Sequence, residues 1–177
     1  PTSSVPGLTF PGYGATAVEA TDFPESLRTS GDTKPRSIAS ISKVVTALVV
    51  LDHKPLRQGQ AGPTITFTPS MQALYAKYLA VNGEVAPMPN GLELSEYQTL
   101  QVMLMKSANN YAGSLALWAF GSMDAYRQAA DEWLDEHGLD HTTIEEPTGL
   151  DAHNTSTATD LVELGQLALA NPVVKEV

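Results

Sequence analysis

The chain has 177 residues, enough for one domain, and 42% of them are hydrophobic, enough for a sizeable core. Its 20 acidic side chains outnumber its 10 lysines and arginines, and a net charge of −10 without a basic run excludes nucleic acid and anionic membranes as expected partners. The lack of cysteine excludes disulfides and a thiol nucleophile, and the longest apolar stretch, residues 44–51, is too short for a transmembrane segment.

The expected elements, in chain order, are short strands on both sides of a mostly helical middle. Residues 1–12 are rich in proline, glycine and serine, which favours an extended N-terminal linker. Apolar periodicity, helix-start signals and turn residues predict the other elements. The expected strands cover 14–19, 64–68 and 141–145, and the expected helices cover 40–51, 69–79, 95–105, 110–120, 124–137 and 157–170.

Ser40 and Lys43 form a candidate nucleophile and base. Residues three apart on a helix share a face, so the Ser40 hydroxyl and the Lys43 amine can meet. A serine attacks when a base takes its proton, and lysine can be that base if burial lowers its pKa. Lys43 is the only charged residue between Arg36 and Asp52, which favours a buried amine with polar partners. The spacing alone also fits a capping serine followed by a solvated lysine.

A second polar element, Ser107-Ala108-Asn109, lies between two expected helices. Its side chains could supply the polar partners that a buried lysine needs. Taken alone, it also fits an ordinary helix cap, because serine and asparagine are common cap residues.

Three segments together resemble one protein family. Residues 38–48 resemble the active-serine helix of the low-molecular-mass penicillin-binding D-alanyl-D-alanine carboxypeptidases, serine peptidases of the S11 type. Residues 106–112 resemble their Ser-x-Asn element, and residues 146–161 resemble their Gly-Leu-Asp and Thr-Ala-x-Asp-Leu stretches. The first two motifs are typical of the penicillin-recognising superfamily. Order and separations match from about Tyr13 to Val174, which makes a chance match a poor explanation.

The resemblance implies a mixed α/β (α+β) fold of the serine β-lactamase and penicillin-binding-protein type. In that fold a helical subdomain packs against an antiparallel sheet with flanking helices. We expect residues 13–177 to be the N-terminal part of such a catalytic domain. Residues 37–137 would form a largely complete helical subdomain, while 13–36 and 138–177 would supply only part of the sheet and its flanking helix.

The third motif of the family, Lys-Thr-Gly on an edge strand, does not occur in these 177 residues. We expect it to lie beyond Val177, so that the chain is truncated before it. The resemblance implies that this strand supplies a cation for the substrate carboxylate and one N–H of the oxyanion hole, the other coming from Ser40. Losing one such donor costs about 10²–10³ in rate. The chain alone is therefore expected to be catalytically poor.

The resemblance also implies a mechanism. Ser40 would attack the carbonyl between two D-alanines of a peptidoglycan stem peptide and form an acyl-enzyme. Lys43 would take the Ser40 proton, Ser107 would relay it to the leaving D-alanine, and Asn109 would orient Lys43 and bind the substrate amide.

The expected partners are the peptidoglycan pentapeptide and β-lactam antibiotics, which would acylate Ser40. The expected location is secreted or at the cell envelope, as a mature form without a signal peptide. No cofactor or metal is expected. His137 and His141 have a spacing that occurs in metal sites, but Gly138 between them is expected to end the helix.

Three alternatives stay open. A β-lactamase would share Ser40, Lys43 and Ser107, and would differ by fast turnover of the antibiotic. A D,D-endopeptidase would share all of the chemistry and cut cross-bridges instead. A non-catalytic module would bind cell-wall peptide or a partner protein, and the missing Lys-Thr-Gly motif favours it.

Overall fold

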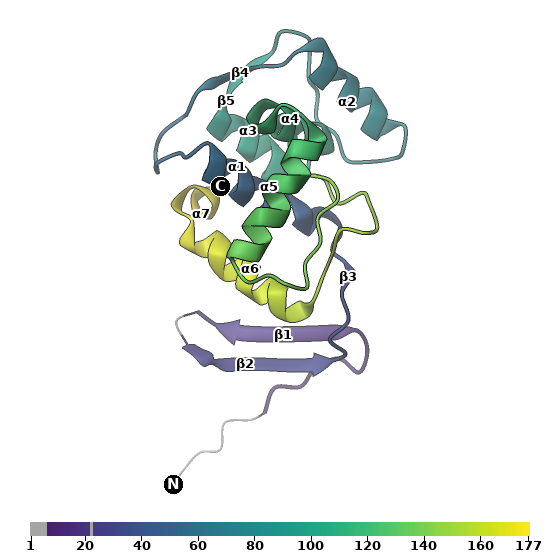
Figure 1. The fold of residues 1–177 in the computed structure, drawn as a ribbon, viewed down its shortest axis with the longest axis vertical. Coiled ribbons are helices and arrows are strands. Elements are labelled where there is room, and N and C mark those ends of the chain that lie inside the picture. The colour runs from purple at the N-terminus through teal and green to yellow at the C-terminus, as the bar shows by residue number, and fades with distance from the viewer. Residues whose placement is uncertain (1–6, 22) are drawn as a thin grey trace.

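The computed structural model describes residues 7–21 and 23–177, which form small antiparallel sheets around a group of helices (Figure 1). The elements follow in the order β1 (Ala15–Ala20), β2 (Phe23–Gly31), β3 (Arg36–Ser37), the 3-10 helix η1 (Ala39–Ile41), α1 (Ser42–His53), β4 (Thr64–Thr66), α2 (Pro69–Leu79), β5 (Glu93–Ser95), α3 (Glu96–Met105), α4 (Asn109–Phe120), α5 (Met123–Glu136), β6 (Thr155–Ser156), α6 (Ala158–Ala170) and α7 (Pro172–Glu176).

Helix α1 runs through the centre of the helical part and is buried over most of its length. On one side, Ala47, Val50 and Leu51 pack into a hydrophobic cluster with residues of α3 and α4. On the other side, Val45 and Leu48 pack with residues of α5 and α6. Helix α1, whose first turn carries Lys43, is therefore packed between two separate hydrophobic clusters.

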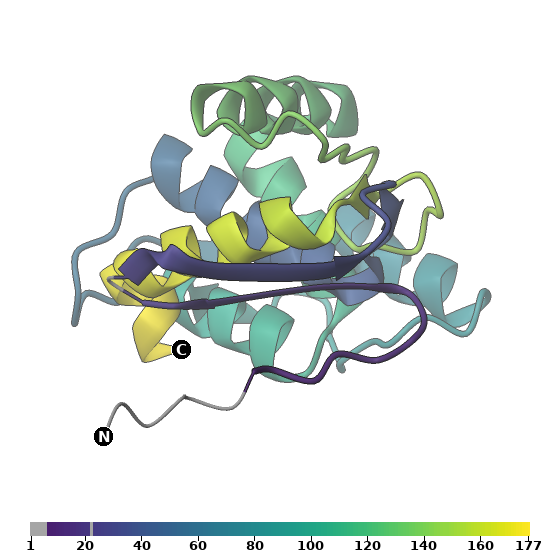
Figure 2. The same cartoon turned by 90° about the horizontal axis from the view of Figure 1, so that it is seen from below.

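Strands β1 and β2 form a hairpin at the lower edge of the molecule in Figure 1, against α6. Figure 2, seen from below, shows the hairpin in front of that helix. Ala15 pairs with Gly31 at one end, and the Gln166 side chain of α6 donates a 2.6 Å hydrogen bond to Glu19 of β1. Because α6 in turn packs against α1, the hairpin is joined to the helical core through one helix.

Two shorter strand pairs bring distant segments together. β4 pairs with β5, with Ile65 opposite Leu94. β3 pairs with β6, with Ser37 opposite Thr155. The second pair holds the segment that leads into η1 next to the segment that follows residues 146–154, and this contact positions the candidate site.

The predicted helices are confirmed to within a few residues at each end. The predicted strand 14–19 is confirmed as β1, and the predicted strand 64–68 as the shorter β4. The predicted strand 141–145 is wrong, because only Thr143 in this segment forms a bridge, to Thr155. Residues 7–12 carry neither helix nor strand, whereas residues 1–6 of the predicted linker lie outside the described part.

Strand β2 and helix α7 were not predicted. Most residues of β2 are polar or small, so the strand depends on backbone pairing with β1 rather than on an alternating apolar pattern. Helix α7 begins one residue after Asn171, whose side chain accepts hydrogen bonds from the N–H groups of Val173 and Val174. Pro172 is the first residue of α7, a position that suits proline because its missing N–H has no partner there in any case.

Among the described residues, no helix combines the length and the apolar character that crossing a bilayer requires.

Candidate active site

Ser40 lies in η1, immediately before α1, with an exposed side chain. The preceding Ala39 has φ of 45°, a left-handed conformation that is uncommon for a residue with a Cβ. Ile38 before it is buried, and its carbonyl accepts the N–H of Ile41. The nucleophile candidate therefore lies on a tight, strained turn anchored to the core, an arrangement frequent at functional sites.

Two side chains donate hydrogen bonds to the Ser40 hydroxyl. The Lys43 Nζ donates to Ser40 Oγ at 3.0 Å, and Ser107 Oγ donates to the same oxygen at 2.8 Å. Ser107 is 67 residues away in sequence, at the junction of α3 and α4. The structure thus brings the Ser-x-x-Lys pair and the first residue of the Ser-x-Asn element into hydrogen-bond contact.

The Lys43 amine is buried, with only 2% of the residue exposed. Besides Ser40, Nζ donates to the backbone carbonyl of Thr148 at 2.7 Å. Burial lowers the pKa of Lys43 from 10.5 to about 8, while the negative charges of Glu146 and Glu84 act in the opposite direction. A fraction of the amine is therefore neutral near physiological pH and has a lone pair for a proton.

Ser107 and Asn109 do not form an ordinary helix cap. The N-cap of α4 is Ala108, and no side chain caps the helix there. Ser107 has φ of 52°, so it also holds a left-handed conformation, and this turn directs its hydroxyl to Ser40. The cap alternative does not explain why a residue with a Cβ adopts that conformation.

Asn109 is the first residue of α4 and is 3% exposed. Its backbone N–H donates to the carbonyl of Glu84 at 2.8 Å. Its side chain lies against Gly83, where an added Cβ would stand 2.6 Å from Asn109 Nδ2. Across the described residues, no hydrogen bond joins the Asn109 side chain to Lys43, so the structure brings three of the four predicted site residues into one network and places the fourth beside it.

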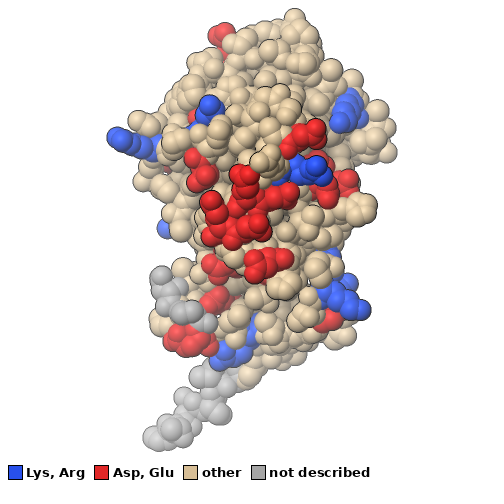
Figure 3. Space-filling model, in the orientation of Figure 1, with Lys and Arg blue, Asp and Glu red and all other residues tan. Residues whose placement is uncertain are grey.

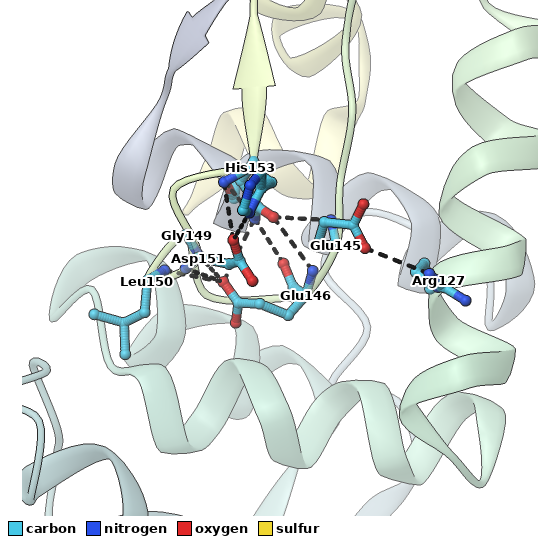
Figure 4. A network of polar contacts seen from close by, with 9 residues as sticks. Arg127, Glu145, Glu146, Gly149, Leu150, Asp151 and His153 are labelled. Carbon is cyan, nitrogen blue, oxygen red and sulfur yellow. Dashed lines mark hydrogen bonds and ion pairs between the residues drawn. The ribbon is translucent and has the colours of Figure 1, made fainter.

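A loop after α5, residues 146–154, completes the site, and its role was missed from the sequence (Figure 4). Its Thr148 carbonyl holds the Lys43 amine across 105 residues of sequence. Gly149, with φ of 83°, lies so close to Ala39 that a Cβ there would overlap the Ala39 carbonyl oxygen. The residues Glu146-Pro147-Thr148-Gly149 mark this loop in the sequence. Its contact with Lys43 uses a backbone carbonyl, however, and such a contact cannot be recognised from side-chain types.

Neither histidine of the spaced pair faces a metal-binding cluster. His137 stacks on Trp133 with ring centroids 4.1 Å apart, and His141 lies 3.5 Å from Asp160. Within residues 7–21 and 23–177, no group of three or more His, Cys, Asp or Glu side chains is arranged to hold a metal ion.

A comparison with protein families matches residues 26–176 to the D-alanyl-D-alanine carboxypeptidase family, Peptidase S11. The match covers most of the chain, and the chain belongs to this family.

Two curated relatives are both named D-alanyl-D-alanine endopeptidase. The protein from Escherichia coli K12 is 37% identical over 129 residues, which are 73% of this chain and 38% of the relative. The protein from Pseudomonas aeruginosa is 35% identical over 127 residues, which are 72% of this chain and 38% of the relative. The chain thus spans well under half the length of these relatives.

Solved structures share the fold. A D-alanyl-D-alanine carboxypeptidase from Mycobacterium tuberculosis superposes with a TM-score of 0.75 and 25% identity, over 98% of this chain and 62% of that one. The Streptomyces K15 DD-transpeptidase gives a TM-score of 0.79 at 20% identity, over 96% of this chain and 64% of that one. The predicted fold class, that of the penicillin-binding proteins, is therefore confirmed.

Proposed function

We propose that this chain carries the acylating centre of a serine-type D-alanyl-D-alanine peptidase acting on peptidoglycan peptides. The observation that supports this most directly is the pair of hydrogen bonds to Ser40 Oγ, from Lys43 at 3.0 Å and from Ser107 at 2.8 Å. A nucleophile, a base with a lowered pKa and a second proton carrier are the groups that acyl transfer needs.

In the first step, neutral Lys43 takes the proton of Ser40 while Ser40 Oγ bonds to the carbonyl carbon of the scissile amide. The carbonyl π electrons move onto its oxygen and give a tetrahedral intermediate. The 3.0 Å contact between Nζ and Oγ is within the reach of direct proton transfer. The helix dipole of α1 favours the negative charge that develops near its N-terminus.

In the second step the carbonyl re-forms and the C–N bond breaks, leaving an ester on Ser40. The departing nitrogen needs a proton, and Ser107 can pass it on from Lys43, because its hydroxyl contacts the same serine oxygen. Water then attacks the ester with Lys43 as base, releases the acid and restores Ser40. Asn109, buried beside this network, is assigned to bind the amide of the substrate backbone.

A β-lactam ring contains a strained amide that the same serine would open to a lasting ester. Peptidoglycan lies outside the cytoplasm, so the proposed place of action is the cell envelope. The family match and the relatives' names support this substrate class.

The cross-bridge endopeptidase is the second candidate. The family is described by carboxypeptidase activity, but both curated relatives, at 37% and 35% identity, are named endopeptidases. Both reactions use the same acyl-enzyme and differ only in the leaving group, a free D-alanine or a cross-linked peptide.

The test uses the protein as its gene encodes it, with any flanking residues. It is incubated with a stem pentapeptide and, separately, with a cross-linked muropeptide dimer, and products are separated by mass spectrometry. D-Alanine release supports the carboxypeptidase, and cleavage of the dimer alone supports the endopeptidase. Ser40→Ala should remove either activity. Binding without cleavage by the wild type would contradict the proposal and favour the non-catalytic module.

A further inference from the structure

The carboxylate of Glu146 accepts the backbone N–H groups of the next turn. Its Oε2 accepts from Thr148 at 2.9 Å, and its Oε1 accepts from Gly149 at 2.6 Å, Leu150 at 2.9 Å and Asp151 at 3.3 Å. Figure 4 shows the Glu146 carboxylate facing the loop, with dashed lines that join it to the backbone near Gly149 and Leu150. Charge-assisted hydrogen bonds of this kind are stronger than neutral ones.

The turn that Glu146 closes contacts both members of the nucleophile pair. The Thr148 carbonyl accepts the Lys43 amine at 2.7 Å. Gly149 lies flat on the strained turn before Ser40, where an added Cβ would come within 3.0 Å of the Ser40 nitrogen. Two consecutive residues of one turn therefore set the position of Lys43 and of the backbone that carries Ser40.

Asn154 ties the other end of the loop to the same turn. Its Nδ2 donates to the Glu146 carbonyl at 2.8 Å and to Ser42 Oγ at 2.9 Å. Ser42 Oγ in turn donates to the Ala39 carbonyl at 2.8 Å. All of these residues are buried or partly buried except Ala39 at the surface, so the network is held against the core and ends next to the nucleophile.

Glu146 also acts on Lys43 through its charge. Among the described residues, no direct ion pair joins the two side chains, because the carboxylate is occupied by backbone amides. Its charge nevertheless favours the ammonium form of Lys43 and opposes the effect of burial on the pKa. Three other ionisable groups interact electrostatically with this pair. The charge of Glu84, after α2, also acts on Lys43, and the charge of Glu146 acts on the phenols of Tyr78 in α2 and Tyr126 in α5.

We propose that Glu146 is a positioning residue of the active site, which folds the 147–151 turn so that Thr148 holds Lys43 and Gly149 fixes the turn of Ser40. Its neighbour Glu145 has a different environment, since its side chain is partly exposed and pairs with Arg127 at 3.4 Å. The proposal rests on the proposed function in assigning chemistry to Ser40 and Lys43, but the positioning itself can be measured without catalysis.

The test compares Glu146→Gln and Glu146→Ala with the matched control Glu145→Gln, in the protein as its gene encodes it. Two readouts are taken: the pKa of Lys43, by NMR of ¹³C-labelled lysine side chains, and the rate at which a fluorescent penicillin acylates Ser40 across pH. The Lys43 signal is assigned by its loss in Lys43→Met.

Glu146→Gln keeps the side-chain shape but removes the charge and the acceptor for the Thr148 N–H. The pKa of Lys43 should therefore fall, and the acid limb of the acylation profile should move to lower pH. Glu146→Ala removes all of the hydrogen bonds between this carboxylate and the turn. Acylation should then slow by roughly 10- to 100-fold, a loss typical of reacting groups that are displaced. Glu145→Gln should match the wild type in both readouts.

A purely structural glutamate would lower the amount of folded protein without moving the Lys43 pKa. Glu146→Gln with an unchanged Lys43 pKa and an unchanged pH profile would overturn the inference, even if Glu146→Ala failed to fold. If the wild type were not acylated at all, the proposed function would fail. A change in the ¹³C shifts of fully protonated Lys43 in Glu146→Gln, absent from Glu145→Gln, would still support the positioning role, because at that pH the shifts report the surroundings of the amine and not its protonation.

Discussion

Burial of the Lys43 amine sets the pH dependence expected of the site. In the fold its pKa is about 8, against 10.5 for an exposed lysine. Only the neutral amine can take the Ser40 proton. Burial favours this neutral form, because a buried ammonium ion loses its hydration, so the surroundings of Lys43 suit the proposed role as base.

The rate of Ser40 acylation by a β-lactam should therefore rise with pH and level off above about 8. Stopped-flow or gel-based acylation rates across the neutral and alkaline range give the profile. Lys43→Met, which removes the base without adding a charge, should lower the plateau by about 10²–10⁴. A profile with no inflection near the Lys43 pKa would contradict the role of Lys43.

Position 149 requires glycine for two reasons, its backbone conformation and the lack of space for a side chain. It has φ of 83°, and a Cβ there would overlap the Ala39 carbonyl. Gly138 has a similar φ of 68°, but a Cβ on it would meet no atom within 4 Å, so it is a matched control.

Gly149→Ala should lower the free energy of unfolding by about 3 kcal/mol or more, because strain and overlap add. Gly138→Ala should cost only about 1–2 kcal/mol, from the left-handed conformation alone. Urea unfolding of the two variants measures the difference. Equal losses would mean that the loop does not press against the Ser40 turn.

At the scale of elements, the first turn of α3 combines an ordinary helix cap with a buried acidic side chain. Ser95 and Gln98 form a capping box at the start of α3, with reciprocal hydrogen bonds of 3.1 and 3.0 Å. Between them, Glu96 is 1% exposed, and its Oε1 has no hydrogen-bond partner among the described residues. Burial raises the pKa of Glu96 from 4.5 to about 7, only partly opposed by the charge of Lys54.

The raised pKa makes the protonated form of Glu96 the one that the fold favours. Its contribution to stability is present below the unfolded pKa of 4.5 and is lost as pH rises through about 7. The free energy of unfolding should decline between about pH 5 and pH 8, by an amount on the order of 2 kcal/mol, and Glu96→Gln should remove that decline. Urea titrations at several pH values test this. The same decline in the variant would show that another group causes it.

Local elements were predictable where the signal was local. Gly138 ends α5 as expected, and Thr68 caps α2 with a proline in its first turn. Strand β2 was missed because pairing with β1, and not its own residues, makes it a strand. The prediction of a strand at 141–145 was wrong because only Thr143 in this segment pairs with another backbone segment, at Thr155.

At the scale of the whole molecule, the candidate site joins three segments that are far apart in sequence. Ser40 and Lys43 were singled out by their spacing together with the apolar surroundings of Lys43 and the family resemblance, and Ser107 by the resemblance of its segment. The contact of Lys43 with the Thr148 carbonyl was not, since any residue has a carbonyl and only the tertiary fold directs this one across 105 residues. The sequence could thus indicate the candidate reacting groups, but not that the 146–154 loop holds them in place.

The surface is strongly acidic, with a formal charge of −10. Acidic side chains gather on the face shown in Figure 3, around α5 and its neighbours. Helix α5 alone exposes five of them: Asp124, Asp131, Glu132, Asp135 and Glu136. Like charges at this density repel one another in the compact state.

Screening should relieve that repulsion, so the melting temperature should rise when NaCl increases from about 10 mM to about 500 mM. Differential scanning calorimetry measures it, and Asp131→Asn with Asp135→Asn should weaken the dependence. A melting temperature that is independent of salt, or that falls with it, would show that the acidic face does not destabilise the fold.

The most direct test of the account is the mass of the protein after incubation with penicillin, in wild type and in Ser40→Ala. We predict one lasting adduct per chain, mapped to the peptide that contains Ser40 and absent from the variant. Rapid release of the adduct would favour the β-lactamase. An adduct that persists in Ser40→Ala, or none on the wild-type protein as its gene encodes it, would contradict the central claim that Ser40 is an activated nucleophile.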